Sequence, residues 1–156
     1  METGQSDDLR PLTAEGQKKF RKGARGIRAL AEDVDEIWSS PLARAHETAR
    51  ILQETYGKLE IVRVPELAVG GAKEKLIRKL RMSSLRKVIL VGHEPDLSEL
   101  ASMLLLHRGV FLDLEIKKGS ALCLELQWGK KLSEAKLLWM MTPRQLRGRW
   151  LSALVD

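Results

Sequence analysis

Two residues suited to phosphate chemistry lie where the sequence predicts that helices begin. Arg44 follows Ser39-Ser40-Pro41, in which Ser40 is a predicted N-cap and Pro41 the first helical residue. The unpaired backbone N–H groups of such a turn and the Arg44 guanidinium can bind one anion together. His93 follows an apolar strand and precedes another predicted helix start, where its imidazole can bind or protonate a phosphoryl oxygen. These residues predict a phosphate pocket.

Each candidate also has a purely structural interpretation. Arg44 can be a solvated helix residue, and His93 can be hydrogen bonded to the backbone of its own loop. Two anion-binding helix starts in one chain favour the functional interpretation. Glu66, which follows Pro65 on a third loop, is a candidate general acid or base, although one loop glutamate is weak evidence.

The other residues of reactive type are given structural roles. His46 is interpreted as a helix-surface residue and His107 as a helix-end residue, and neither has metal-ligand spacing from His93. Cys123, the only cysteine, is interpreted as a packing residue and excludes both an internal disulfide framework and a multi-cysteine zinc site. We therefore expect no metal and no cofactor.

The apolar positions predict the helices that carry these residues. They recur at steps of three and four along residues 13–34 and 42–56, which is the helical period. A third helix is predicted after Gly70-Gly71. A fourth begins at Asp96, which together with Glu99 has the spacing of a capping box.

Short apolar runs between the helices predict three strands, at residues 36–38, 61–64 and 88–91. The run at 88–91 does not alternate with polar residues, which favours a central parallel strand covered on both faces. Alternating residues on either side of Gly129-Lys130 predict a hairpin, with strands at 122–128 and 136–141.

This alternation of strands and helices predicts an α/β domain with a mostly parallel sheet between two helical layers. Ligands of such sheets bind at the carboxyl ends of the strands. The candidate loops at that edge are residues 39–44, 65–71 and 92–96.

The composition indicates one folded domain over residues 1–156, with 44% apolar and 31% charged residues. The net charge of +6 favours an anionic ligand, but 4% aromatic residues and no binding motif argue against nucleic acid. Apolar runs fall short of the roughly 18 residues of a membrane span, and the polar N-terminus is unlike a secretory signal. We expect a cytoplasmic protein without a membrane partner; the sequence leaves its oligomeric state open.

The motifs resemble those of the histidine phosphatase superfamily. Ser-Ser-Pro-Leu-Ala-Arg-Ala-His-Glu-Thr-Ala at 39–49 is similar to its Ser-Pro-Leu-x-Arg-Ala-x-x-Thr-Ala signature, and Val-Gly-His-Glu-Pro at 91–95 to its Gly-His-x-Pro motif. Residues 8–16, 65–67 and 139–143 are similar to segments of the SixA-type protein phosphohistidine phosphatases. The resemblance implies a three-layer, phosphoglycerate mutase-like α/β/α fold and no metal.

The resemblance also implies a reaction. A histidine nucleophile accepts the phosphoryl group, and water then hydrolyses the phosphohistidine intermediate. Arg44 would bind phosphate, and His93 would be the second active-site histidine that stabilises charge on the phosphoryl oxygens. Glu66 would be a helper at most, because an imidazole leaving group needs little acid assistance. The implied substrate is a phosphohistidine-containing protein; a small phosphomonoester, or phosphate binding without catalysis, is the alternative.

The sequence departs from this family at its N-terminus. Family members begin with an apolar strand that runs into an Arg-His-Gly triplet containing the nucleophile, whereas the nine residues before Arg10 contain no histidine. Either the natural protein starts upstream of Met1, or this is a shortened paralogue that binds phosphate without catalysis. We prefer the first explanation, because loss of a central strand would expose the edges of its neighbours. We therefore expect a domain without its first strand and without catalytic activity as written.

Overall fold

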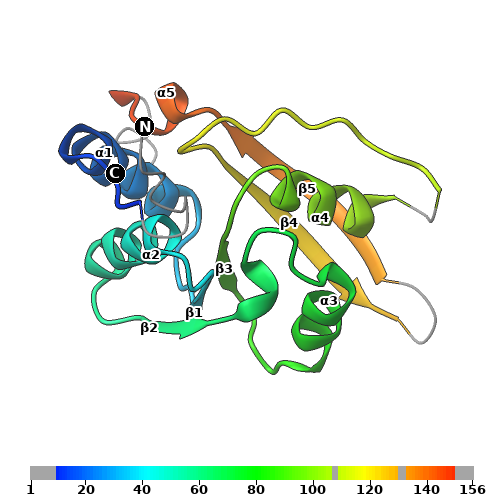
Figure 1. Cartoon of the computed structure of the whole chain (residues 1–156). Coiled ribbons are helices and arrows are strands. Elements are labelled where there is room, and N and C mark those ends of the chain that lie inside the picture. Colours follow the sequence, from blue (N-terminus) through cyan, green and yellow to red (C-terminus); the bar gives the residue numbers. More distant parts are fainter. Residues whose placement is uncertain (1–9, 107–108, 130–132, 150–156) are drawn as a thin grey trace, which may run out of the picture.

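The computed structural model describes residues 10–106, 109–129 and 133–149, and it confirms the predicted α/β class (Figure 1). In chain order the elements are α1 (Ala14–Leu30), β1 (Glu36–Ser39), α2 (Ala43–Tyr56), β2 (Glu60–Arg63), the 3-10 helix η2 (Pro65–Leu67), α3 (Lys73–Met82), β3 (Val88–Val91), α4 (Asp96–Leu105), β4 (Ala121–Trp128), β5 (Ser133–Met141) and α5 (Pro143–Leu146). Two residues with predicted positions lie outside the described residues. They are His107, predicted at a helix end, and Lys130, predicted in the hairpin turn.

The described strands form two separate sheets. One is parallel, in the order β2-β1-β3, and the other is the predicted antiparallel hairpin of β4 and β5. The expectation that β3 is central is wrong for the described residues, because β1 takes the central place and Ile37 pairs with Ile61 on one side and Ile89 on the other. A continuous apolar run indicates that both faces of a strand are covered, but it does not indicate how many of its edges are hydrogen bonded to other strands.

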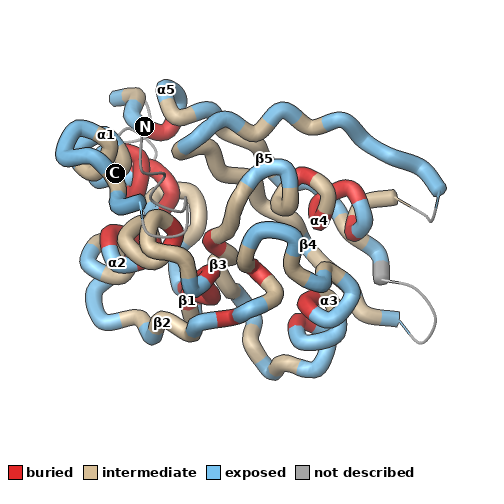
Figure 2. Tube along the Cα trace, viewed as in Figure 1, coloured by how far each residue is buried: buried red, intermediate tan, exposed pale blue. Residues whose placement is uncertain are grey.

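Helices cover both faces of the parallel sheet and bury a core on each. One core is built by α1, α2, β1 and α5, with buried residues that include Ala24, Ile37, Ala49, Leu52 and Leu146. The other is built by α3 and α4 against the opposite face, with buried residues that include Trp38, Leu76, Leu80, Leu100 and Leu104. Figure 2 shows these buried segments between the layers. The predicted three-layer arrangement is confirmed.

The predicted helices are present, but their ends differ from the predictions. Thr13 caps α1 by accepting a hydrogen bond from the Gly16 N–H at 3.0 Å, and the helix ends at Leu30 rather than Val34. α2 begins at Ala43 with Leu42 as N-cap, so Ser40 is not its cap. Within the described part of the chain, no helix is long and apolar enough to cross a membrane.

We expect Ile37→Ala to destabilise the domain strongly, because Ile37 is fully buried on the central strand. Truncating such a residue costs about 2–5 kcal/mol in free energy of unfolding. Met82→Ala is the control, since Met82 is 80% exposed and should change stability by less than about 0.5 kcal/mol. Urea denaturation measures both. A loss below about 1 kcal/mol for Ile37→Ala would contradict the central position of β1.

Candidate phosphate-binding site

A side-chain hydrogen bond joins the carboxyl ends of β1 and β3. Ser40 follows β1 and His93 lies just after β3, and Ser40 Oγ and His93 Nε2 are 2.8 Å apart. The Ser40 N–H also donates to the Val91 carbonyl at 2.8 Å. Because Ser40 is fully buried, this contact fixes the imidazole at the sheet edge where ligands of parallel sheets bind.

Arg44 lies in the first turn of α2, four residues after Ser40. This turn has no side-chain N-cap and no acidic residue. Ser40 Oγ accepts from the Leu42 N–H at 3.2 Å and also contacts His93. A cation at a helix N-terminus opposes the helix dipole, whereas an anion there is stabilised by both the dipole and the guanidinium. The start of α2 is therefore an electrostatically favourable place for a phosphoryl group.

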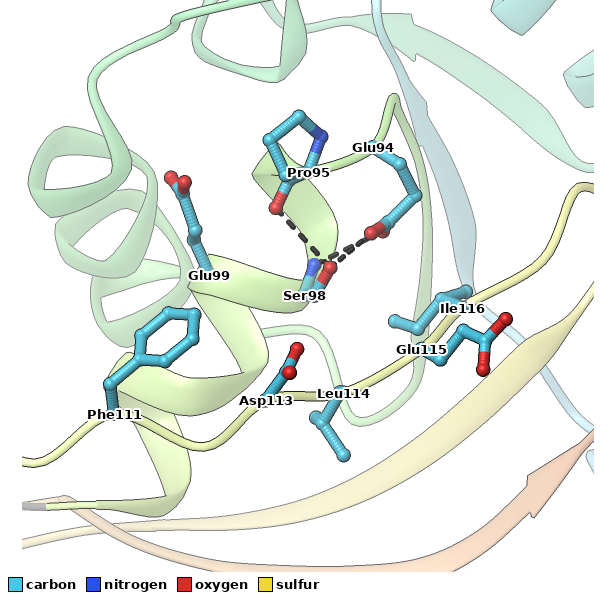
Figure 3. A pocket seen from close by; sticks show the side chains of 9 residues that line it. All are labelled: Glu94, Pro95, Ser98, Glu99, Phe111, Asp113, Leu114, Glu115 and Ile116. Carbon is cyan, nitrogen blue, oxygen red and sulfur yellow. Dashed lines mark hydrogen bonds between the residues drawn. The ribbon is translucent and has the colours of Figure 1, made fainter.

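The start of α4 is different, because carboxylates already occupy it. The Glu94 carboxylate accepts hydrogen bonds from the Ser98 N–H, at 3.1 Å, and from the Ser98 hydroxyl (Figure 3). Asp96 accepts from the Gly70 N–H at 3.0 Å and from Lys73 Nζ at 2.7 Å. The predicted Asp96–Glu99 capping box is thus wrong, and of the two predicted anion-binding helix starts only that of α2 is free of acidic side chains.

The Lys73–Asp96 ion pair ties the loop before α3 to the start of α4. Burial alone would raise the pKa of Asp96, but hydrogen bonds from Lys73 and the Gly70 N–H lower the pKa below its usual value. Burial alone would lower the pKa of Lys73, but its bonds to Asp96 and, at 3.0 Å, to Glu99 raise it. Both groups therefore stay charged at neutral pH, and their side chains are 16% exposed.

Glu66 lies on the third predicted loop, in η2, but its carboxylate is bound by Lys79 Nζ of α3 at 2.8 Å. This hydrogen bond lowers the pKa of Glu66, so the carboxyl is ionised at neutral pH and is a poor proton donor. The loop itself does reach the site, since a Cβ on Gly92 would lie 3.4 Å from the Leu67 carbonyl oxygen.

A cavity of about 410 Å³ lies between the start of α4 and residues 111–116. Figure 3 shows the carboxylates of Glu94, Glu99, Asp113 and Glu115 among its lining side chains. Negative charges in this number repel an oxyanion. The cavity is therefore not the phosphate pocket.

His46 lies on a helix, as predicted, but its ring is not fully at the surface. It lies on α2, and its Nδ1 is buried without a hydrogen-bond partner among the described residues. Burial lowers the pKa of His46, and the nearby charges of Arg63 and Arg50 lower it further, so its imidazole is neutral at pH 7. In the described ranges, no three histidine, cysteine or acidic side chains are grouped to hold a metal ion.

Sequence patterns missed the contacts that hold the site together. The sequence pattern predicts Ser40 at a helix start, and no feature of the neighbouring residues identifies His93, 53 residues away, as its partner. The same holds for Lys73 with Asp96, and for the Leu12 N–H, which donates to the Glu47 carboxylate at 2.6 Å. Only the opposite charges of Lys73 and Asp96 could have indicated a pair.

Comparison with known proteins agrees with the motifs. Residues 3–68 match the model of the histidine phosphatase superfamily (branch 1). An uncharacterized protein from Picosynechococcus sp. is 32% identical over 102 residues, which is 61% of this chain and 59% of that protein. The chain thus matches a little over half of the length of this curated relative.

Two solved structures share the fold over nearly the whole chain. The protein histidine phosphatase SixA complexed with tungstate superposes with a TM-score of 0.75 and 20% identity, covering 92% of this chain and 90% of that one. A candidate phosphohistidine phosphatase SixA from Nakamurella multipartitia gives a TM-score of 0.67 and 20% identity over 91% and 90% of the two chains. At this identity the likeness concerns the fold.

We expect Asp96→Asn to lower the free energy of unfolding by about 1.5–3 kcal/mol at pH 6, because it removes a charged acceptor from Lys73 and Gly70. The folded-state pKa of Asp96 lies below the unfolded one, so its contribution is present above about pH 4 and is lost as the pH falls through the folded pKa. The difference from wild type should therefore shrink below about pH 4.

The control is Glu15→Gln, which removes an exposed 3.0 Å pair with Lys19 and should cost less than about 0.5 kcal/mol. Urea denaturation between pH 3 and pH 6 measures both variants. A difference between Asp96→Asn and wild type that is the same at both pH values would contradict the ion pair.

Proposed function

We propose that the chain is a member of the histidine phosphatase superfamily, whose model matches residues 3–68. In this proposal the carboxyl edge of its sheet binds the phosphoryl group of a phosphohistidine-containing protein and supports its hydrolysis. One arrangement carries the proposal. The Ser40–His93 hydrogen bond lies beside a first turn of α2 that contains Arg44, no acidic residue and no side-chain cap.

In this proposal Arg44 and His93 bind the phosphoryl oxygens, and Ser40 orients the imidazole of His93. A guanidinium matches two oxygens of a phosphoryl group, and the N–H groups at the start of α2 add further donors. As negative charge grows on those oxygens during transfer, donors that are already in place stabilise the transition state. The tungstate bound by the solved SixA is an oxyanion as well, and this makes tungstate a suitable probe here.

The chemical step needs a nucleophile in addition to this pocket. In the proposed reaction, an imidazole nitrogen bonds to phosphorus while the bond from phosphorus to the substrate's histidine breaks, and water later hydrolyses the phosphoenzyme. His93 is assigned to oxygen binding, and Nδ1 of His46 is buried on α2. We therefore assign no nucleophile among the described residues and propose that they supply the phosphoryl-binding part of the site.

A small phosphomonoester is the second candidate substrate, and the state of Glu66 argues against it. An alkoxide leaving group needs a proton from an acid, whereas Glu66 is ionised and held by Lys79. Phosphohistidine needs less assistance because imidazole is the better leaving group. A purely non-catalytic binding module is the third candidate, and turnover by the exact chain above that of an Arg44/His93 double variant would eliminate it.

One further part of the proposal rests on the sequence. We propose a cytoplasmic location, because a single cysteine fits a reducing compartment.

We expect the wild-type chain to bind tungstate, and Arg44→Ala and His93→Ala each to weaken binding by about tenfold or more, through loss of a charge-assisted contact. Arg50→Ala is the matched control, since Arg50 is an exposed arginine on the same helix, and it should change the affinity less than twofold. Isothermal titration calorimetry at pH 7 measures all four proteins. Equal loss in all three variants would indicate binding by net charge alone and would contradict the pocket.

We expect Glu66→Gln to leave phosphohistidine hydrolysis nearly unchanged in any catalytically active form of the protein, because Glu66 is ionised beside Lys79. The assay compares the hydrolysis rates of a phosphohistidine-containing protein and of a simple alkyl phosphate. Selective loss of at least about tenfold on the alkyl phosphate would favour the phosphomonoester candidate instead.

A further inference from the structure

The outer edge of β2 has open hydrogen-bonding groups. β2 is an end strand of the parallel sheet and, among the described strands, pairs with β1 alone (Figure 1). The Val64 N–H donates to the Ser39 carbonyl of β1 at 2.8 Å. Backbone groups alternate in direction along a strand, so the N–H and C=O groups of Ile61 and Arg63 point away from β1. These groups can pair with a further strand.

A groove of about 380 Å³ lies between β2 and α3, beside this edge. Its volume is within the range of ligand pockets, roughly 300–1,000 Å³. The residues that line it belong to β1, to β2 and the residue after it, and to α3 and the residue after it: Trp38, Val62, Arg63, Val64, Arg78, Lys79, Met82 and Ser83. Because Arg63 is one of them, the groove reaches the open edge of β2.

Much of the groove surface is apolar. Trp38 lines it with an indole whose N–H already donates to the Glu36 carboxylate at 2.8 Å. Val62 packs on the core cluster of α3 and α4 and is only partly buried. Met82 is 80% exposed. An apolar side chain that covers Val62 and Met82 would remove this area from water, which favours binding.

The residues that line the groove include cations and no acidic residue. Lys79 is paired with Glu66 at 2.8 Å, which offsets its charge. Arg63 and Arg78 are both exposed, and neither takes part in an ion pair within the described part of the chain. A carboxylate that approaches either guanidinium is attracted to it and can be hydrogen bonded by it.

The two arginines lie on opposite faces of the sheet edge. Val62 and Val64 pack on the α3 side, so Arg63 between them points to the α2 side. There, burial and then the charge of Arg63 lower the pKa of His46 on α2. Arg78 belongs to α3, on the groove side. A strand added beside β2 can therefore have carboxylates near an arginine on both of its faces.

We infer that the groove beside β2 binds an acidic, extended segment of a partner protein, which pairs with the open edge of β2. Apolar side chains of the segment cover Val62 and Met82, and its carboxylates lie near Arg63 and Arg78. In this mode of recognition main-chain hydrogen bonds supply affinity, and alternate side chains supply specificity. The inference does not depend on the proposed function, because neither Arg44 nor His93 lines the groove.

The probe is the peptide Asp-Glu-Val-Glu-Val-Glu-Asp with blocked ends. When it is extended, the valines and the two terminal carboxylates lie on one face and the glutamates on the other. The matched control is Asn-Gln-Val-Gln-Val-Gln-Asn, which keeps the shape and the valines but has no charge. Fluorescence anisotropy of labelled peptides at low ionic strength measures binding to the full chain. The acidic peptide should bind about tenfold or more tightly than its neutral analogue.

Arg78→Glu should weaken binding of the acidic peptide by about fivefold or more, because it replaces an attraction with a repulsion. The matched control is Lys18→Glu, which makes the same change of charge at an exposed position of α1, on the other face of the sheet. It should change the affinity less than about twofold, since distant exposed charges are screened. An unchanged urea midpoint checks that Arg78→Glu folds.

Hydrogen exchange detected by NMR locates the bound peptide. At saturation the amides of Ile61 and Arg63 should exchange about tenfold or more slowly than in the free chain. The internal control is the Leu90 amide of β3. The Val91 carbonyl accepts from the Ser40 N–H on the β1 side, so the Leu90 N–H faces away from β1 and has no partner strand among those described. Its exchange should not change.

Slower exchange at Ile61 and Arg63, with a loss of affinity confined to Arg78→Glu, supports the inference. Four results overturn it: no saturable binding of the acidic peptide, equal binding of its neutral analogue, equal loss in Lys18→Glu, or equal slowing at Leu90. Unchanged exchange of the Ile61 and Arg63 amides also overturns the pairing. Protection of these amides without peptide that grows with protein concentration would overturn it in favour of a second copy of this chain.

Discussion

The hydrogen bond between Ser40 and His93 is the interaction on which the candidate site depends. It joins the loops after two adjacent parallel strands and is buried on the serine side. Close to this contact, α2 begins without a side-chain cap, and Arg44 lies in a first turn that has no acidic residue. A helix start of this kind is stabilised by a bound anion. The same contact therefore orients the imidazole beside a helix start that favours an anion.

Local patterns predicted the elements, and long-range contacts decided the details that they missed. The apolar run at 88–91 is β3 in full, and both helical periods are present. The predicted cap failed at Ser40 because α2 begins only at Ala43, and at Asp96 because its carboxylate has distant partners. Asp96 binds the Gly70 N–H and Lys73, which are 26 and 23 residues away. Spacing alone reveals which groups can pair locally, not which partner the tertiary fold supplies.

The position of β3 within the sheet could not be predicted from its residue types, because they do not show which strands pair with it. Apolar side chains indicate that helices and the hairpin cover the strand, whereas the residue types do not distinguish a paired backbone edge from an unpaired one. The family resemblance supplied the expectation of an absent first strand.

The most direct test of the central claim is the ¹⁵N NMR spectrum of the histidine rings during titration with inorganic phosphate at constant pH. The account predicts that both ring nitrogens of His93 shift and saturate, since Nε2 is hydrogen bonded to Ser40 within the pocket. The ring of His46, with its buried Nδ1, should stay unchanged. Saturable phosphate binding that shifts His46, or that leaves His93 unchanged, would contradict the site.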